Sequence, residues 1–257
     1  MSHVLKAAVP VALAALAAAW ALLSPPLLQV QAYHLFADTR ALPSIANAAD
    51  TLSNVAFLIV GVLGLAFLWR ERAPGGAGRF ISPQEMRPYW VFFSGVALTS
   101  VGSAYYHLAP DDARLVWDRL PMTIAFMSLV AAVVSERISV RAGSLLLWPL
   151  VLLGLASVVY WRWSALAGVE NLRPYVAVQF GSIAVVLAIS ILYCSRYTLG
   201  DVIFALAAAY GVAKVVEVYD REIFEFGEWV SGHTLKHLAA AVGVYLLLRA
   251  LELRVRR

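Results

Sequence analysis

Eight long runs of apolar residues most strongly limit what this chain can fold into. A helix needs about 20 mostly apolar residues to cross a bilayer. The runs cover residues 4–23, 51–69, 89–107, 120–135, 142–161, 174–194, 198–216 and 233–248. We therefore predict an all-α protein, a polytopic membrane helical bundle with a seven-span core and an extra N-terminal transmembrane helix.

The composition supports a membrane protein and excludes a soluble globular enzyme. Of the 257 residues, 61% are hydrophobic and 14% are charged, and the mean hydropathy is +0.76. Soluble domains have about 45–50% apolar and about 25% charged residues. The net charge of +4 does not indicate nucleic-acid binding, because the basic residues are scattered between apolar runs. The single cysteine, Cys194, excludes an intrachain disulfide and a cysteine-based metal cluster.

Three parts can be distinguished along the chain. Residues 1–30 are predicted to form an N-terminal transmembrane helix, residues 38–250 the seven-span domain, and residues 251–257 a basic cytoplasmic tail. The first run could also be a signal peptide, since Lys6 precedes an Ala/Leu stretch. It is long for a signal peptide and lacks a convincing cleavage site, so an uncleaved anchor is favoured.

The distribution of Lys and Arg predicts how the chain is oriented. If the N-terminus is cytoplasmic, 12 of these residues lie in cytoplasmic segments and 6 in outer segments. The positive-inside rule then places both termini in the cytoplasm. Residues 24–50, 108–119, 162–173 and 217–232 would lie together on the outer side. Abundant Ala, and Arg at 17 of the 20 basic positions, hint at a GC-rich bacterial genome, for which the membrane would be the plasma (inner) membrane.

Three of the five histidines fall at span ends on the predicted outer side. His107 ends the third run, and His233 and His237 begin the eighth. Two histidines four residues apart project from one helix face about 6 Å apart, a spacing that zinc sites use. The alternative is a pair of interfacial histidines that cap or snorkel. A third histidine at the same depth favours a zinc site with one open position for water.

Two further polar residues lie close to His107 in the sequence. Ser103 is four residues earlier and so on the same helical face, although a serine there could also bond to its own helix. Asp118 comes eleven residues after His107, just before the fourth run. It could act in chemistry, or it could stabilise the start of the next helix, with Pro121 in the first turn.

Other acidic and amide side chains have several possible explanations. Asp38, Asn47, Asp50 and Asn54 gather around the start of the second run. Such oxygen-rich groups could hold a hard cation such as Ca²⁺, and polar packing and capping explain them equally well. An acidic stretch is expected to form a solvated outer loop, in which Lys214 and Glu217 have the spacing of a helical ion pair. Its members are Glu217, Asp220, Glu222, Glu225 and Glu228.

Four short motifs, taken in order and spacing, resemble the alkaline ceramidase family. They are Asp50-Thr51-Leu52-Ser53-Asn54, Gly102-Ser103-Ala104-Tyr105-Tyr106-His107, Trp117-Asp118-Arg119-Leu120-Pro121-Met122 and His233-Thr234-Leu235-Lys236-His237. Any one motif would be weak, whereas the ordered combination is specific. The resemblance covers residues 38–249 and implies a member of the CREST superfamily of membrane hydrolases, which also includes the progestin and adipoQ receptors.

The resemblance implies a reaction and a role for each matching residue. The family hydrolyses the amide of ceramides to a sphingoid base and a fatty acid. His107, His233 and His237 would be the zinc ligands, Asp118 the acid/base aspartate, and Ser103 the serine that faces the metal site.

The expected cofactors and partners follow from the same resemblance. Zn²⁺ is expected, and the partners would be the membrane and a lipid substrate, with no nucleic acid. A calcium site is known in family members, and Asp38, Asn47 and Asp50 are its candidates here. Residues 39–41 lack the dense acidic run expected for such a site.

Three alternatives to an amidase remain open. A receptor-type member of the superfamily would share the fold and the histidines. A transporter without hydrolase activity would explain Lys214, Lys236 and Asp201 in or near spans, but no inverted repeat is visible. A serine intramembrane protease would use Ser103 and leave the three histidines unexplained. If the source is bacterial, the substrate could be another N-acyl lipid or an ester.

Overall fold

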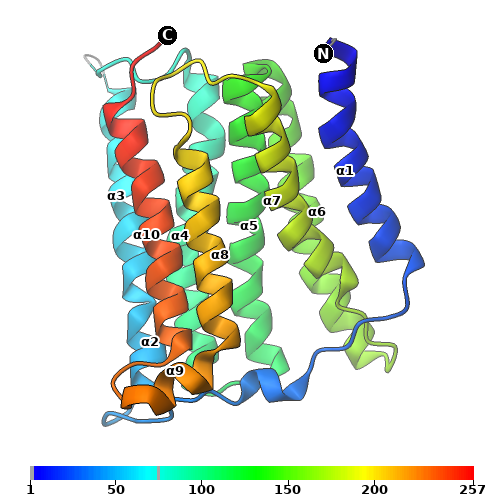
Figure 1. The fold of residues 1–257 in the computed structure, drawn as a ribbon, viewed down its shortest axis with the longest axis vertical. Helices are drawn as coiled ribbons and strands as arrows, with labels where there is room; N and C mark the ends of the chain where they lie inside the picture. The colour runs from blue at the N-terminus through cyan, green and yellow to red at the C-terminus, as the bar shows by residue number, and fades with distance from the viewer. Residues whose placement is uncertain (1–2, 74–75) are drawn as a thin grey trace.

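The computed structural model describes residues 3–73 and 76–257 and consists mainly of long helices (Figure 1). The elements are α1 (His3–Leu23), η1 (Gln31–His34), α2 (Ala48–Ser53), α3 (Val55–Arg72), α4 (Pro83–Leu108), α5 (Asp112–Arg137), α6 (Val140–Leu166), α7 (Arg173–Leu192), α8 (Val202–Val218), α9 (Asp220–Gly227) and α10 (Gly232–Leu253). Each of the eight predicted apolar runs lies largely in a long helix of its own, and the prediction of an all-helical bundle is confirmed. The short helices α2 and α9 extend α3 and α8 at one end of the bundle.

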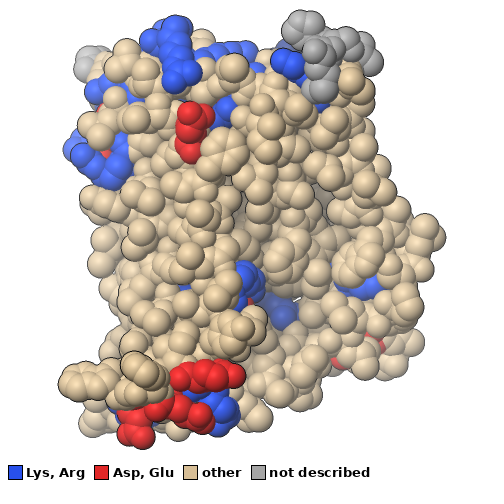
Figure 2. Space-filling view, in the orientation of Figure 1, with Lys and Arg blue, Asp and Glu red and all other residues tan. Residues whose placement is uncertain are grey.

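The lengths and surfaces of these helices identify a multi-pass membrane protein. Counting α2 with α3 as one helix, 6 helices within the described residues are long and apolar enough to cross a membrane. The pair α8–α9, bent by 71°, would make a seventh. The more polar α4 lies inside the bundle, where it packs against α3, α5 and α6. On the face drawn in Figure 2, most charged side chains lie near the two ends of the bundle, and the surface between them is largely uncharged apart from a few basic groups.

Helix α1 lies at the edge of the bundle, apart from the helices that carry the three histidines. α10 packs against α8 and α3, whereas α1 packs against α7 at the edge of the bundle. The start of α1 and the C-terminus lie at the same end, and the loop that contains η1 crosses the opposite end (Figure 1). The three histidines singled out in the sequence lie at this opposite end, where α4 finishes and α10 begins.

The fifth helix starts earlier than its apolar run predicts. The Asp111 side chain accepts a hydrogen bond from the Arg114 backbone N–H at 2.7 Å and caps α5, which begins at Asp112. Asp118 and Pro121 therefore lie inside the helix, and Asp118 does not cap its start. The first turns of α5 were not predicted as helix because polar residues interrupt their apolar pattern. Leu115 in these turns is nevertheless fully buried.

The last helix runs further than residue 250, and the chain after it folds back onto the bundle. α10 ends at Leu253, and the next residue, Arg254, is buried. Its guanidinium donates to a Glu136 carboxylate oxygen at 2.9 Å and lies 3.8 Å from the Tyr197 ring centre. The start of the predicted cytoplasmic tail is therefore part of the packed structure.

A candidate metal centre beside an apolar cavity

Three buried histidines from two helices converge at one end of the bundle. His107 lies in the last turn of α4, and His233 and His237 lie in the first turns of α10. One nitrogen from each ring can be chosen so that all three atoms lie within 4.8 Å of one another. Within the described residues, this is the cluster of His, Cys, Asp or Glu side chains that could hold a metal ion.

His107 shows most clearly that the cluster suits a metal ion. Its ring is 1% exposed, and neither ring nitrogen has a hydrogen-bond partner among the described residues. The Phe36 ring packs against it at 4.7 Å between centres. A buried imidazole without a partner is costly. A metal ion bound to one nitrogen would remove that cost, and imidazole nitrogen is a preferred ligand of zinc.

The partner of His237 selects which nitrogen of that ring faces the cluster. The Ser53 hydroxyl donates to the Asp50 carbonyl oxygen at 2.9 Å and lies 2.8 Å from His237 Nδ1. A hydroxyl has only one proton, so its oxygen accepts from the Nδ1–H of His237. The lone pair on Nε2 is then left for a ligand, which is the usual arrangement of a metal-binding histidine.

His233 already has a cationic neighbour. Its Nε2 lies 2.6 Å from the Lys236 ammonium nitrogen, which also donates to Glu217 at 3.1 Å. A zinc ion bound through this nitrogen would replace the ammonium as its partner, and Glu217 would keep Lys236 paired. A three-histidine site therefore requires the Lys236 ammonium to leave His233, and Glu217 is the partner that remains for it.

Two carboxylates hold the start of α10 in place. Asp220 accepts hydrogen bonds from the backbone N–H of His233 at 2.7 Å and of Ala37 at 3.0 Å. Asp50 accepts from the hydroxyls of Ser231 at 2.9 Å and Thr234 at 2.5 Å. These bonds connect α10 to α2, to α9 and to the loop before α2. The position of His233 and His237 is thus set from three sides.

A close approach of α4 and α5 brings Ser103 and Asp118 together. A Cβ atom added to Gly102 would lie 2.0 Å from the Trp117 carbonyl oxygen, so only glycine allows this contact. That oxygen lacks its ordinary helical donor, because the residue four positions later is Pro121. Next to this contact, the buried Ser103 hydroxyl interacts with the Asp118 carboxylate.

Ser103, Asp118 and His237 line one cavity of about 190 Å³ between α4, α5, α7, α8 and α10. Away from the histidines its walls are largely apolar. These walls include Phe92, Leu129, Val186, Ile203 and Val244. Leu129 lies eleven residues beyond Asp118 on α5, about 16 Å along the helix. The cavity therefore has a polar end at His237, Asp118 and Ser103 and continues between apolar side chains.

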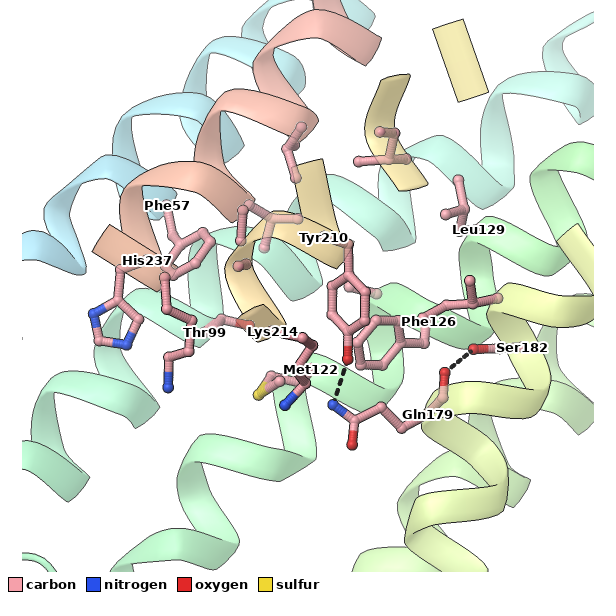
Figure 3. A pocket seen from close by; sticks show the side chains of 18 of the residues that line it. Phe57, Thr99, Met122, Phe126, Leu129, Gln179, Ser182, Tyr210, Lys214 and His237 are labelled. Carbon is pink, nitrogen blue, oxygen red and sulfur yellow. Dashed lines mark hydrogen bonds between the residues drawn. The ribbon is translucent and has the colours of Figure 1, made fainter. Parts of the chain in front are cut away.

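One polar pair interrupts the apolar wall. The Gln179 amide donates to the Tyr210 hydroxyl at 2.6 Å (Figure 3). Phe126 lies beside Tyr210, with 5.7 Å between ring centres. The pair connects α7 to α8, two helices that otherwise touch little.

The acidic stretch predicted as a solvated loop is divided in the structure. Glu222, Glu225 and Glu228 are exposed as expected. The prediction is wrong for Glu217, whose side chain is 13% exposed and accepts from Lys214 at 2.6 Å, Lys236 at 3.1 Å and Tyr33 at 3.1 Å. The predicted Lys214–Glu217 pair is confirmed. Lysines within apolar runs need a buried counter-charge, and this need is the signal in the sequence that points to Glu217.

The three residues considered for calcium each have a separate partner. Arg40 donates to both carboxylate oxygens of Asp38, at 2.8 and 2.7 Å, and so holds the pKa of Asp38 below its usual range. Asn47 donates to the His107 carbonyl oxygen at 2.7 Å, and Asp50 binds the start of α10. Each of the three side chains is thus bound to a different part of the chain, and calcium binding at Asp38, Asn47 and Asp50 stays a prediction.

Arg119 and Ser53 also contact the candidate site, and neither residue was predicted from the sequence to have a role there. Arg119 lines the cavity next to Asp118, and Ser53 contacts His237. Both lie within the motifs that carried the family resemblance, and their neighbours are distant in the sequence. Only the packing of the helices shows what they contact.

Comparison with known proteins assigns the chain to a family. The family model described as Ceramidase matches residues 38–225, a segment that contains Ser103, His107 and Asp118 and ends before His233 and His237. No curated protein sequence matches the chain. The matched segment is 188 of the 257 residues, well over half of the chain. The chain therefore belongs to the Ceramidase family.

Proposed function

We propose that this protein is a zinc-dependent membrane amidase that hydrolyses the N-acyl bond of ceramide or a ceramide-like lipid to a long-chain amine and a fatty acid. The convergence of His107, His233 and His237 at the polar end of an apolar cavity is the observation that carries the proposal. Membership of the Ceramidase family supports a lipid substrate with an amide bond.

A zinc ion held by these histidines would act as a Lewis acid and would lower the pKa of a water molecule toward about 7. Asp118 accepts the proton of the attacking water and then delivers it to the nitrogen of the leaving amine. Its burial at the cavity wall, on the side of Ser103, keeps this proton away from bulk water.

Ser103 has two successive tasks in this scheme. Its hydroxyl first interacts with the Asp118 carboxylate and orients it. Once Asp118 carries a proton, the hydroxyl is free to donate to the substrate carbonyl oxygen as negative charge develops there. Donors of this kind contribute about 3 kcal/mol to transition-state stabilisation.

The apolar part of the cavity would hold the substrate chains. Each buried methylene contributes about 0.8 kcal/mol, so a long chain provides enough free energy to position the amide beside the histidines. A hollow in the surface between α8 and α7 leads toward basic atoms in the interior (Figure 2). A lipid would enter sideways through this hollow, with its polar linkage at the membrane interface.

We further propose that both termini are cytoplasmic and that the histidine site faces the outer side of the membrane. Basic side chains gather at the end of the bundle that carries the C-terminus (Figure 2). The positive-inside rule places this end in the cytoplasm. Labelling of single cysteines introduced into the loops of a variant lacking Cys194 would test the orientation.

Zinc removal and restoration test the proposed reaction. The protein, purified in detergent, is incubated with ceramide, and the released amine and fatty acid are measured by mass spectrometry. Hydrolysis should cease after chelation and return when Zn²⁺ is added. Hydrolysis that continues without metal would overturn the zinc-dependent mechanism. A protein that holds zinc but hydrolyses no N-acyl lipid would point to the receptor type.

A further inference from the structure

Arg119 is a buried cation that the proposed reaction does not use. Its side chain is 5% exposed and follows Asp118 directly in α5. The guanidinium lies close to three aromatic rings, 4.4 Å from the centre of Trp161, 4.6 Å from that of Tyr175 and 5.9 Å from that of Tyr33. A charged side chain buried in a membrane protein is costly and commonly marks a functional site.

The guanidinium is held by groups that are themselves fixed. Its Nη2 donates to the Gln29 side-chain oxygen at 2.6 Å, and the backbone N–H of Gln29 donates to Glu170 at 3.1 Å. The Trp161 ring nitrogen donates to the same Glu170 oxygen at 2.9 Å. The Tyr175 hydroxyl also interacts with the guanidinium. This arrangement gives Arg119 one orientation before any ligand binds, which lowers the entropic cost of binding.

One donor of this fixed group is unused. Arg119 Nη1 is buried and has no hydrogen-bond partner among the described residues, and none of their carboxylates lies within ion-pair distance of the guanidinium. Arg119 lines the same cavity as Asp118 and Ser103. An acceptor oxygen on a molecule in that cavity would satisfy both the free donor and the charge.

The other charges of the cavity leave an excess of positive charge. Arg119, Lys214 and Lys236 line it together with Asp118 and Glu217. Glu217 is shared by the two lysines, so it is not available to Arg119. Figure 2 shows basic atoms inside the hollow between α8 and α7. The electrostatic environment therefore favours an anionic group on the ligand over a neutral one.

We propose that Arg119 binds an anionic headgroup oxygen, a carboxylate or a phosphate close to the amide, and that the substrate class is an N-acyl lipid with such a headgroup. The inference rests on the proposed amidase function and narrows its substrate from ceramide, which is neutral, to ceramide-like N-acyl lipids that carry an anionic headgroup. The binding itself can be measured without hydrolysis. Arg119 is a binding residue in this account, and Asp118 remains the acid/base group.

Three lipids with the same acyl chain and amide test the proposal. They are N-palmitoylglycine, N-palmitoylethanolamine phosphate and neutral N-palmitoylethanolamine. Binding to the full chain in detergent is measured by calorimetry with a chelator present, so that no lipid is hydrolysed. We expect at least one anionic lipid to bind about tenfold more tightly than the neutral lipid, and the tighter of the two identifies carboxylate or phosphate.

Three arginine variants separate charge recognition from structure. Arg119→Gln should bind the three lipids with similar affinity. Arg114→Gln is the matched control, because Arg114 lies on the same helix, stacks on Tyr105 at 4.9 Å and does not line the cavity. This control should keep the preference of the native chain. Arg119→Lys keeps the charge and should retain part of the preference.

The native chain alone decides the proposal if Arg119→Gln fails to fold. Equal or tighter binding of the neutral lipid would overturn it, as would a folded Arg119→Gln protein that keeps the anionic preference. Hydrolysis of the same lipids is measured separately with zinc. Preference without hydrolysis would refute the amidase and leave anion binding intact, whereas hydrolysis without preference would do the reverse.

Discussion

The Ser53 hydroxyl lies 2.8 Å from Nδ1 of His237 and bridges that ring to the Asp50 carbonyl oxygen. This contact sets the protonated nitrogen of His237 and directs the other nitrogen toward His107 and His233. Ser53 on α2 therefore orients His237, a candidate metal ligand on α10. The broken start of the second span, where α2 meets α3, places Ser53 at the required position.

Ser53→Ala should lower zinc affinity about ten- to a hundredfold, because His237 would lose the acceptor that orients its ring. Competition with a fluorescent chelator measures the dissociation constant. Ser128→Ala is the control, since the Ser128 hydroxyl donates to carbonyl oxygens of its own helix at 2.6 and 3.2 Å. Equal zinc affinity in Ser53→Ala and the native chain would show that the contact does not support the metal.

Asp118→Asn should retain bound zinc and lower kcat at least about a hundredfold, because the amide side chain cannot accept the proton. Metal content and steady-state hydrolysis of the N-acyl lipid are measured on the same preparation. Asp112→Asn provides the comparison, since Asp112 lies on the same helix and pairs with His34 outside the cavity. Normal turnover by Asp118→Asn would remove its acid/base role.

Gly102→Ala should destabilise the fold by about 1–3 kcal/mol and reduce turnover, because the added methyl group overlaps the Trp117 carbonyl oxygen. Separation of α4 from α5 would also pull Ser103 away from Asp118. Gly211→Ala has open space around its new Cβ and should be neutral or slightly stabilising. Thermal unfolding in detergent compares the two, and equal melting temperatures would argue against a tight α4–α5 contact.

The Asp38–Arg40 pair predicts a specific dependence of stability on pH. Arg40 also donates to the carbonyl oxygens of Glu228 and Trp229, at 2.7 and 3.0 Å, so the pair ties the loop before α2 to the chain after α9. The pKa of Asp38 is lowered in the folded protein. The pair therefore stabilises the fold fully above the unfolded pKa of about 3.9, and this contribution disappears as the pH falls through the lower folded value.

Asp38→Asn should accordingly melt at a lower temperature than the native chain at pH 7. The difference should shrink to near zero below the folded pKa of Asp38, where the native carboxyl group is protonated as well. Melting curves of both proteins at pH 7 and at a series of lower pH values provide the comparison. A difference of the same size at every pH would mean that the charge of Asp38 contributes nothing.

The eight long helices could be predicted from the sequence, because membrane spans depend on the local length of apolar runs. Their ends could not, and neither could the short helices α2 and α9. α5 begins at Asp112, eight residues before its apolar run, since its first turns are polar and bury Leu115 against other helices. Residues 109–111, which connect α4 to α5, form a shorter link than the predicted outer segment 108–119.

The histidine cluster was predicted from spacing and depth, since His-x3-His and a distant histidine at the same membrane face require little knowledge of packing. Glu217 and Arg119 were not predicted as site residues. Glu217 belongs to an acidic stretch that is mostly exposed, and its burial depends on Lys236 of another helix. In the sequence, Arg119 was considered only as one of the basic residues that indicate the orientation of the chain. The aromatic rings next to its guanidinium belong to Trp161 on α6 and Tyr175 on α7, which are distant in the sequence.

Zinc stoichiometry of His233→Ala tests the central claim most directly. His34→Ala is the matched control, because His34 lies outside the cluster and bonds to Tyr106 and Asp112. Mass spectrometry of the metal content should find one zinc ion per chain in the native protein and in His34→Ala. We predict that His233→Ala, purified in the same way, binds no zinc and does not hydrolyse N-acyl lipid. Full zinc occupancy in folded His233→Ala would contradict the three-histidine site.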